Sequence, residues 1–159
     1  MILVVLGTHE LPFTRLLEAV DSLKTAGKLD DEIVVQSGHT KFTSSHMKLI
    51  PFISYEELGA LYDEARLIIT HAGTGSVITG IKKGKKVIAA PRLEKYGEHN
   101  DDHQLQLVDE FVQAGYIVAW HDGDSLEDII QQATTFEPKP FKSGRDQMLS
   151  IIEDFINNI

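Results

Sequence analysis

A strand-like run that stops at a histidine and two glycines places the strongest constraint on how this chain folds. Residues 67–70 are apolar or β-branched, His71 follows them, and residues 73–76 read GTGS. This order predicts a buried strand, a tight turn and the start of a helix. Backbone N–H groups at a helix N-terminus suit a phosphate or another anion. An ordinary strand-to-helix turn that uses glycine for its backbone freedom also fits the pattern, so the turn alone leaves both interpretations open.

The rest of the chain alternates short apolar runs with stretches of helical periodicity. The apolar runs predict strands at residues 2–6, 33–35, 47–52, 67–70, 86–90 and 116–120. This alternation predicts an α/β fold, a doubly wound, mostly parallel, Rossmann-like sheet with helices on both faces. Residues 40–46 are too few for an ordinary crossover helix, so the path of residues 38–52 stays open. We expect one domain over residues 1–159.

The last segment carries an apolar stripe at helical spacing. It predicts an amphipathic helix over residues 143–158, with Met148, Ile152, Phe155 and Ile159 along one face. Such a face packs against the core of its own domain or covers another subunit. Both interpretations stay open, and we take this helix as the candidate contact with a partner.

Composition excludes several functional classes. The chain has no cysteine, which rules out disulfides and thiolate metal sites. Its formal net charge of −9 argues against nonspecific binding to nucleic acid or to an anionic membrane surface. No apolar run approaches the roughly 20 residues that span a bilayer. We therefore expect no nucleic-acid partner, and membrane contact only through another protein.

The predicted topology brings three loops to one place. In doubly wound sheets, ligands bind outside the carboxyl ends of the strands, where the strand order reverses. The first and fourth strands would flank that crevice in the common order. The loops at residues 7–12, 71–76 and 91–100 would then open on the same edge, which favours a binding site over a plain turn.

Two familiar nucleotide motifs and a metal site do not fit. The dinucleotide fingerprint fails because Ile78 stands where its third glycine belongs. The phosphate loop of nucleotide hydrolases fails on the glycine spacing of residues 80–86. His99, Asp101, Asp102 and His103 begin a predicted helix, where consecutive side chains diverge around the axis. We therefore expect no metal ion and no cofactor.

Three segments together resemble the C-terminal, donor-binding half of glycosyltransferase family 28. They are THAGTGSVITG at residues 70–80, GKKVIAAP at 84–91 and EHNDDHQLQL at 98–107. The sequence is similar to free-standing subunits that carry only this half. These include β-1,4-galactosyltransferase subunits of capsule and exopolysaccharide synthesis, and the catalytic subunit of the two-subunit dolichol-linked N-acetylglucosaminyltransferase. The resemblance implies the C-terminal half of the glycosyltransferase B fold.

The resemblance also implies where a donor binds. A nucleotide sugar would lie across the carboxyl edge of the sheet, with its diphosphate facing the backbone of residues 73–76. The implied donor contacts are Gly7, Thr8, His9, His71, Gly73, Thr74, Gly75, Ser76, Asp102, His103 and Gln104. Arg92 joins them as a candidate phosphate contact on position alone. No catalytic base is identified, and His9 and His71 are the candidates.

Two departures from the family pattern shape the expected function. Thr79 stands where related enzymes commonly carry a glutamate that accepts hydrogen bonds from the ribose. The N-terminal, acceptor-binding half is also missing. The chain is therefore expected to be the donor-binding subunit of a split, inverting UDP-sugar hexosyltransferase that transfers galactose or N-acetylglucosamine to a lipid-linked saccharide.

Such a subunit would act with a membrane-anchored, acceptor-binding partner, as a cytoplasmic protein held peripherally at the inner face of the membrane. The alternative is a noncatalytic subunit that regulates or stabilises a partner glycosyltransferase. The unidentified base and Thr79 keep that alternative open.

Overall fold

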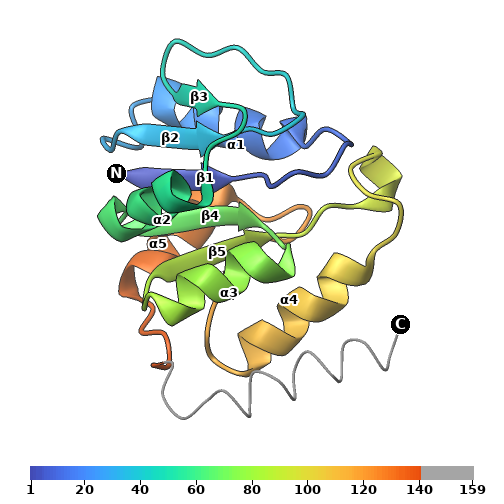
Figure 1. Ribbon diagram of the computed structural model, residues 1–159. Helices are drawn as coiled ribbons and strands as arrows, with labels where there is room; N and C mark the ends of the chain where they lie inside the picture. The colour runs from blue at the N-terminus through green and yellow to red at the C-terminus, as the bar shows by residue number, and fades with distance from the viewer. Residues whose placement is uncertain (141–159) are drawn as a thin grey trace.

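The computed structural model describes residues 1–140 of the chain (Figure 1). Its strands are β1 (Ile2–Val5), β2 (Ile33–Gln36), β3 (Lys48–Ile50), β4 (Leu67–His71), β5 (Lys86–Ala90) and β6 (Val118–Ala119). Its helices are α1 (Thr14–Thr25), α2 (Tyr55–Glu64), α3 (Thr74–Lys82), α4 (His103–Gln113) and α5 (Leu126–Thr135), with a 3₁₀ turn η1 (Glu94–Tyr96). The helix predicted at residues 143–158, with its Met148 to Ile159 stripe, lies outside the described residues.

The strands of the described chain form one parallel sheet in the order β3-β2-β1-β4-β5-β6. This order confirms the doubly wound, Rossmann-like fold that the sequence predicts. The chain winds outward from β1 to β3, returns to the centre with β4, and winds outward again to β6. The order of strands therefore reverses between β1 and β4, and the loops at residues 7–12, 71–76 and 91–100 all leave the same edge of the sheet.

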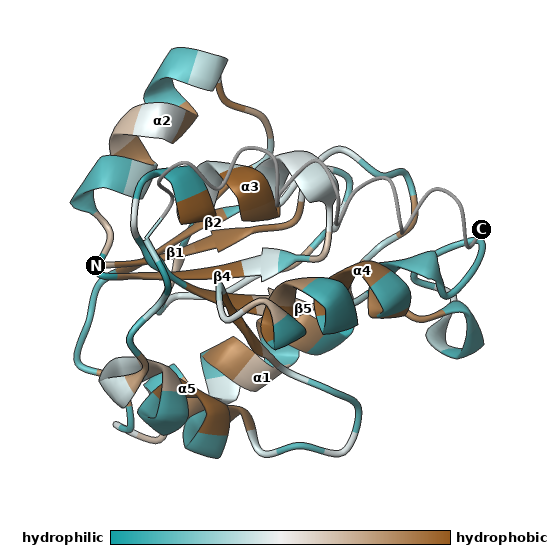
Figure 2. Cartoon of the chain, turned by 90° about the horizontal axis from the view of Figure 1, so that it is seen from below, coloured by the Kyte–Doolittle hydropathy of each residue, from teal (hydrophilic) through white to brown (hydrophobic). Residues whose placement is uncertain are grey.

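Both faces of the sheet are covered, which explains why its central strands read as unbroken apolar runs. Ile2 and Val4 pack in one layer with α1 and α5, whereas Leu3 and Val5 pack in the opposite layer with α2, α3 and α4. Viewed along the sheet in Figure 2, the helices turn hydrophobic surface toward the strands and hydrophilic surface outward. This two-layer core holds the carboxyl edge of the sheet rigidly in place.

Local signals in the sequence set several helix starts. The hydroxyl of Ser54 accepts a hydrogen bond from the Glu57 N–H at 3.1 Å, and Ser125 caps α5 in the same way. The start of α4 differs, because the helix begins at His103 rather than at Asp101. Asp101 instead accepts the His103 N–H at 3.0 Å from outside the helix.

The segment between β2 and β3 has no crossover helix. Residues 37–47 run as an irregular connection, and the Thr40 hydroxyl ties them to α1 by accepting the Phe13 N–H at 2.9 Å. The third strand predicted within residues 47–52 is present as β3, at the edge of the sheet. Within residues 1–140, no helix is long and apolar enough to cross a membrane.

Candidate functional site

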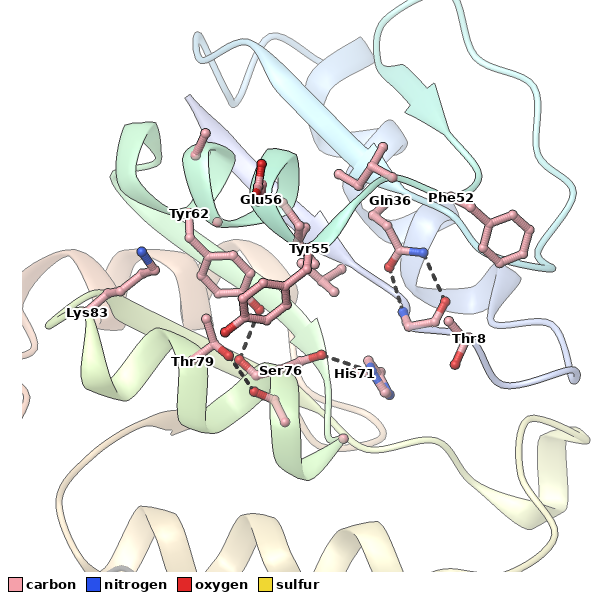
Figure 3. A pocket seen from close by; sticks show the side chains of 18 of the residues that line it. Thr8, Gln36, Phe52, Tyr55, Glu56, Tyr62, His71, Ser76, Thr79 and Lys83 are labelled. Carbon is pink, nitrogen blue, oxygen red and sulfur yellow. Dashed lines mark hydrogen bonds between the residues drawn. The ribbon is translucent and has the colours of Figure 1, made fainter. Parts of the chain in front are cut away.

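A cavity of about 920 Å³ opens at the carboxyl edge, where β1 and β4 end (Figure 3). Its walls are the turn after β1, the connection between β3 and α2, the inner side of α2, and α3. Eight of the donor contacts implied by the sequence line it: Gly7, Thr8, His9, His71, Gly73, Gly75, Ser76 and Gln104. The topology therefore brings these residues from three separate segments into one site.

The N-terminus of α3 faces this cavity without a side-chain cap. Gly73 is the N-cap residue in an extended conformation, and no side chain of residues 1–140 caps the first turn. A Cβ atom placed on Gly75 would meet no atom within 4 Å, so the backbone there is open to a ligand. Uncapped N–H groups and the positive end of the helix dipole make this terminus suitable for an anion.

His71 explains two of the glycines that the sequence attributes to ligand approach. Its imidazole lies between Gly7 and Gly73, and a Cβ atom on Gly7 would come 2.5 Å from Nε2 of His71. A Cβ atom on Gly73 would meet the same ring. These two glycines therefore make room for a side chain, whereas Gly75 leaves room for a ligand.

The His71 ring is held neutral. Burial, followed by the nearby charges of Arg92, His9 and His99, lowers the pKa of His71 to about 3. Its Nε2 lies 3.4 Å from the Ser76 hydroxyl, as Figure 3 shows, while its buried Nδ1 has no hydrogen-bond partner among the described residues. A ring with so low a pKa is a weak base, so the geometry disfavours His71 as the proton acceptor.

His9 is also suited to donating rather than accepting a hydrogen bond. Its Nδ1 accepts the Leu11 N–H at 3.1 Å, which leaves the proton of the neutral ring on Nε2. The ring stacks on His99 with centroids 4.5 Å apart. Burial, followed by the charges of His99 and Arg92, lowers the pKa of His9. A neutral His9 therefore offers an N–H to an anion in the cavity.

Gln36 is a site residue that the sequence analysis missed. It ends β2, is 5% exposed, and lines the cavity. Its amide oxygen accepts the Gly7 N–H at 2.8 Å, and its amide nitrogen donates to the Gly7 carbonyl at 3.0 Å (Figure 3). The available signal is a polar residue at the carboxyl end of an otherwise apolar strand.

The sequence analysis also did not identify α2 and the segment before it as a wall of the site. Phe52 and Tyr55 line the cavity and are 54% and 87% exposed. Tyr62 is buried, and its hydroxyl donates to the Ser76 carbonyl at 3.0 Å, which ties α2 to α3. Burial raises the pKa of Tyr62 to about 12, so this hydroxyl remains a donor. Across the cavity on α3, the Thr79 hydroxyl donates to the Gly75 carbonyl at 2.7 Å.

Arg92 does not support the phosphate contact expected from its position. It is 1% exposed and does not line the cavity. Its guanidinium donates to the carbonyls of Leu6 at 2.8 Å, Leu11 at 2.7 Å and Glu98 at 3.1 Å. Burial lowers its pKa to about 10, a value that still keeps it charged at neutral pH. Arg92 therefore joins the turn after β1 to the loop after β5 instead of facing a ligand.

Of the remaining predicted contacts, Gln104 lines the cavity, whereas Asp102, His103 and Thr74 do not. The carboxylate of Asp102 accepts the Glu94 N–H at 3.0 Å, and neither Asp102 nor His103 lines the cavity. Thr74 is exposed beside the cavity without lining it. Gln104 does line it. Its Oε1 accepts the Arg92 N–H at 2.9 Å, which leaves its amide N–H groups available to a ligand.

The part of the site at the strand ends is therefore built from hydrogen-bond donors and apolar walls, and Glu56, Asp63 and Lys83 line it farther along α2 and α3. Within residues 1–140, no cluster of three or more histidine, aspartate or glutamate side chains is placed to hold a metal ion. The donors are the α3 N-terminus, the His9 ring and the Gln104 amide. Such an arrangement suits a ligand with a central anion and an apolar or aromatic end.

Comparisons with known proteins point to one family. The model of the glycosyltransferase family 28 C-terminal domain matches residues 1–159. The UDP-N-acetylglucosamine transferase subunit ALG13 of Yarrowia lipolytica is 28% identical over 137 residues, which cover 79% of this chain and 68% of that protein.

Solved structures share the fold. The solution structure of ALG13 superposes with a TM-score of 0.56 at 21% identity, over 88% of each chain. The glycotransferase of kitacinnamycin superposes with a TM-score of 0.61 at 17% identity, over 98% of this chain but only 39% of the enzyme. The chain thus corresponds to about two fifths of that enzyme. Because the family model spans residues 1–159, the chain belongs to the glycosyltransferase family 28 C-terminal domain family.

Proposed function

We propose that this chain is the donor-binding subunit of a split, inverting glycosyltransferase that transfers a hexose from a UDP-sugar to a lipid-linked saccharide. The observation that carries the proposal is the uncapped N-terminus of α3 facing a cavity at the strand-order reversal. A UDP-sugar has the matching chemistry, with a diphosphate between an aromatic base and a sugar. Membership of the family supports the same ligand class.

The proposed chemistry needs charge stabilisation more than any other contribution. Displacement at the anomeric carbon breaks the bond to the β-phosphate oxygen, and the bonding electrons leave with uridine diphosphate. Backbone N–H groups of α3 and the Nε2–H of His9 would hydrogen-bond to that leaving group as its negative charge grows. Fixed donors in a partly closed cavity do this without rearrangement, and Gln104 would contact the sugar.

The acceptor hydroxyl must lose a proton, and neither histidine of the cavity is suited as the base. His71 has a pKa of about 3, and His9 already uses its Nδ1 as an acceptor. We therefore assign the base, the acceptor site and the attachment to the membrane to a partner subunit. On this proposal, the complex works as a peripheral assembly at the cytoplasmic face of the membrane.

N-acetylglucosamine and galactose are the candidate sugars. The ALG13 relative is named as a UDP-N-acetylglucosamine transferase subunit, which favours N-acetylglucosamine. The resemblance to capsule and exopolysaccharide enzymes favours galactose. Competition between UDP-N-acetylglucosamine and UDP-galactose for the purified chain would separate them, because the preferred donor displaces the other at lower concentration.

The first test is isothermal titration calorimetry of the chain with UDP, and with UMP as a control. The proposal predicts that UDP binds saturably and that UMP binds markedly more weakly, since UMP lacks the second phosphate. Absence of UDP binding at millimolar ligand would contradict it. ADP serves as a second control that reports selection of the base.

A noncatalytic subunit is the second candidate, and the low pKa of His71 specifically favours it. The fold would then stabilise a partner glycosyltransferase without binding a donor. Assaying the reconstituted complex separates the two candidates. A donor-binding subunit loses transfer activity when Gln104→Ala is introduced, whereas a noncatalytic subunit retains it while complex formation stays intact.

A further inference from the structure

The side chain of Gln36 makes three hydrogen bonds, all of them to main-chain atoms of two different loops. Its amide group pairs with both the N–H and the carbonyl of Gly7, and the same nitrogen donates to the Pro51 carbonyl at 3.0 Å. Gly7 begins the turn that carries Thr8 and His9. Pro51 begins the connection that carries Phe52, on the facing wall of the cavity.

The backbone around this contact is closely packed. Gly7 and Gly38 both have positive φ angles, 75° and 58°, which glycine adopts without strain. A Cβ atom on Gly38 would collide with the Gly7 carbonyl, and one on Gly7 would collide with the His71 ring. The Gly7 peptide is therefore held by Gln36 on one side and by His71 on the other.

We propose that Gln36 is a positioning residue for the donor, which fixes the distance between the turn after β1 and the wall that begins at Pro51. This inference rests on the proposed function, because it assigns Gln36 a role in that same cavity. Gln36 acts through the loops and does not itself contact the diphosphate. Its amide already uses its oxygen and its nitrogen on Gly7 and Pro51, so little hydrogen-bonding capacity remains for a ligand.

The physical reason is that the donor must touch both walls at once. Its diphosphate would meet the turn that holds Thr8 and His9, while its nucleoside would reach the wall that holds Phe52. Small errors in the spacing of such walls have large effects on binding and catalysis. A glutamine suits this role because it offers a donor and an acceptor on one rigid plane.

Thr40 provides a matched control for a purely structural role. It is as buried as Gln36, at 5% exposure, and it also bonds from the same connection to a main-chain atom, the Phe13 N–H. Thr40 does not line the cavity. Thr40→Val therefore removes a buried hydrogen bond nearby without changing either wall of the site.

The experiment compares Gln36→Met, Gln36→Glu and Thr40→Val in the full-length chain, by calorimetry with UDP and by thermal unfolding. Gln36→Met should weaken UDP binding about ten- to hundredfold, because it removes the side chain that joins the Gly7 turn to the Pro51 wall. Thr40→Val should lower the melting temperature but leave UDP affinity within about twofold of the original chain. Comparable UDP affinity in Gln36→Met and the original chain would overturn the proposal.

Gln36→Glu adds a readout that a structural role would not move. A neutral carboxylic acid can donate to one carbonyl and accept the Gly7 N–H, as the amide does, whereas a carboxylate repels both carbonyls. The UDP affinity of Gln36→Glu, divided by that of the original chain at the same pH, should therefore rise as the pH is lowered from about 8 to about 5. This ratio removes the titration of His9, which both proteins share. A ratio that stays constant with pH would also overturn the proposal.

Hydrogen exchange separates failure of this inference from failure of the proposed function. If the original chain does not bind UDP, the proposed function fails. The positioning role then still predicts faster amide exchange at Thr8 and Phe52 in Gln36→Met than in Thr40→Val. Equal exchange rates at these two amides in both variants would contradict the role of Gln36.

Discussion

Two glycines of α3 have opposite surroundings, and this contrast allows binding to be separated from stability. Gly75 faces the cavity, where a Cβ atom meets nothing within 4 Å. Gly80 faces the sheet, where a Cβ atom would come 2.6 Å from Cγ2 of Val87. A side chain at Gly75 therefore occupies ligand space, and one at Gly80 occupies core space.

Gly75→Val should abolish tight UDP binding without destabilising the chain. Valine has a better helix propensity than glycine by a few tenths of a kcal/mol, so stability should stay equal or rise by up to about 0.5 kcal/mol. The isopropyl group would keep the diphosphate from two helix N–H groups. Each hydrogen bond to a charged group contributes about 1.5–3 kcal/mol, so the loss is at least about 3 kcal/mol, or roughly a hundredfold in Kd.

Gly80→Ala is the matched control. Its methyl group overpacks the contact with Val87, at a cost of about 1–3 kcal/mol. Each kcal/mol lowers the melting temperature by about 2–4 °C in a domain of this size. UDP affinity, measured by calorimetry below the transition, should not change. If Gly75→Val instead loses stability in proportion to its loss of affinity, Gly75 is a structural glycine and the reasoning is refuted.

Three further predictions concern the residues around the cavity. Because the pKa of His71 falls to about 3 in the folded chain, the unfolded chain takes up a proton on this ring first as the pH falls. The free energy of unfolding should therefore keep its full value above about pH 6.5 and decline by up to about 5 kcal/mol toward pH 3. His71→Asn should flatten this decline in urea titrations. Arg92→Lys places its donors on a single nitrogen, which cannot stand where both guanidinium nitrogens bind the carbonyls of Leu6, Leu11 and Glu98. It should cost about 2–4 kcal/mol in thermal unfolding while the remaining folded chain keeps its UDP affinity. A selective loss of affinity would restore Arg92 as a phosphate contact. Thr79→Glu offers a carboxylate to the ribose hydroxyls and should tighten UDP binding several-fold. The affinity for 2′,3′-dideoxy-UDP, which lacks these hydroxyls, should not change. Equal changes in affinity for both ligands would argue against a ribose contact at this position.

Local signals in the sequence were enough to predict most of the elements. Apolar runs predict the buried strands because both faces of a parallel sheet are covered. The caps of Ser54 and Ser125 are local in the same sense, because each involves only residues within one turn. The strand order follows from short, right-handed connections, and it places the site at the reversal between β1 and β4.

What the sequence could not predict depends on contacts between distant segments. Gly7 and Gly73 are glycines because the His71 ring lies between them, which no spacing rule reveals. Arg92 reads as an exposed cation near a phosphate site, yet it is buried against carbonyls of the turn after β1. Gln36 reads as a strand end, and its role appears only when Gly7 lies next to it.

The electrostatics of the site fit an anionic ligand in an acidic protein. The chain carries a formal net charge of −9, which opposes the approach of a diphosphate. A helix N-terminus, neutral histidines and amide donors in the cavity offset this repulsion, rather than lysines or arginines alone. Affinity for UDP should therefore depend only weakly on salt, because few mobile ions are released.

The most direct test of the central claim is a map of UDP binding by amide chemical shifts in the full chain. If the cavity is the donor site, the largest changes in amide chemical shift on adding UDP occur at Thr8, Gly75 and Ser76. These changes saturate with one Kd, equal to the Kd from calorimetry. Gly75→Val should remove them. Shifts that cluster elsewhere, for example on α5 at the opposite face of the sheet, or no shifts at saturating UDP, would contradict the account.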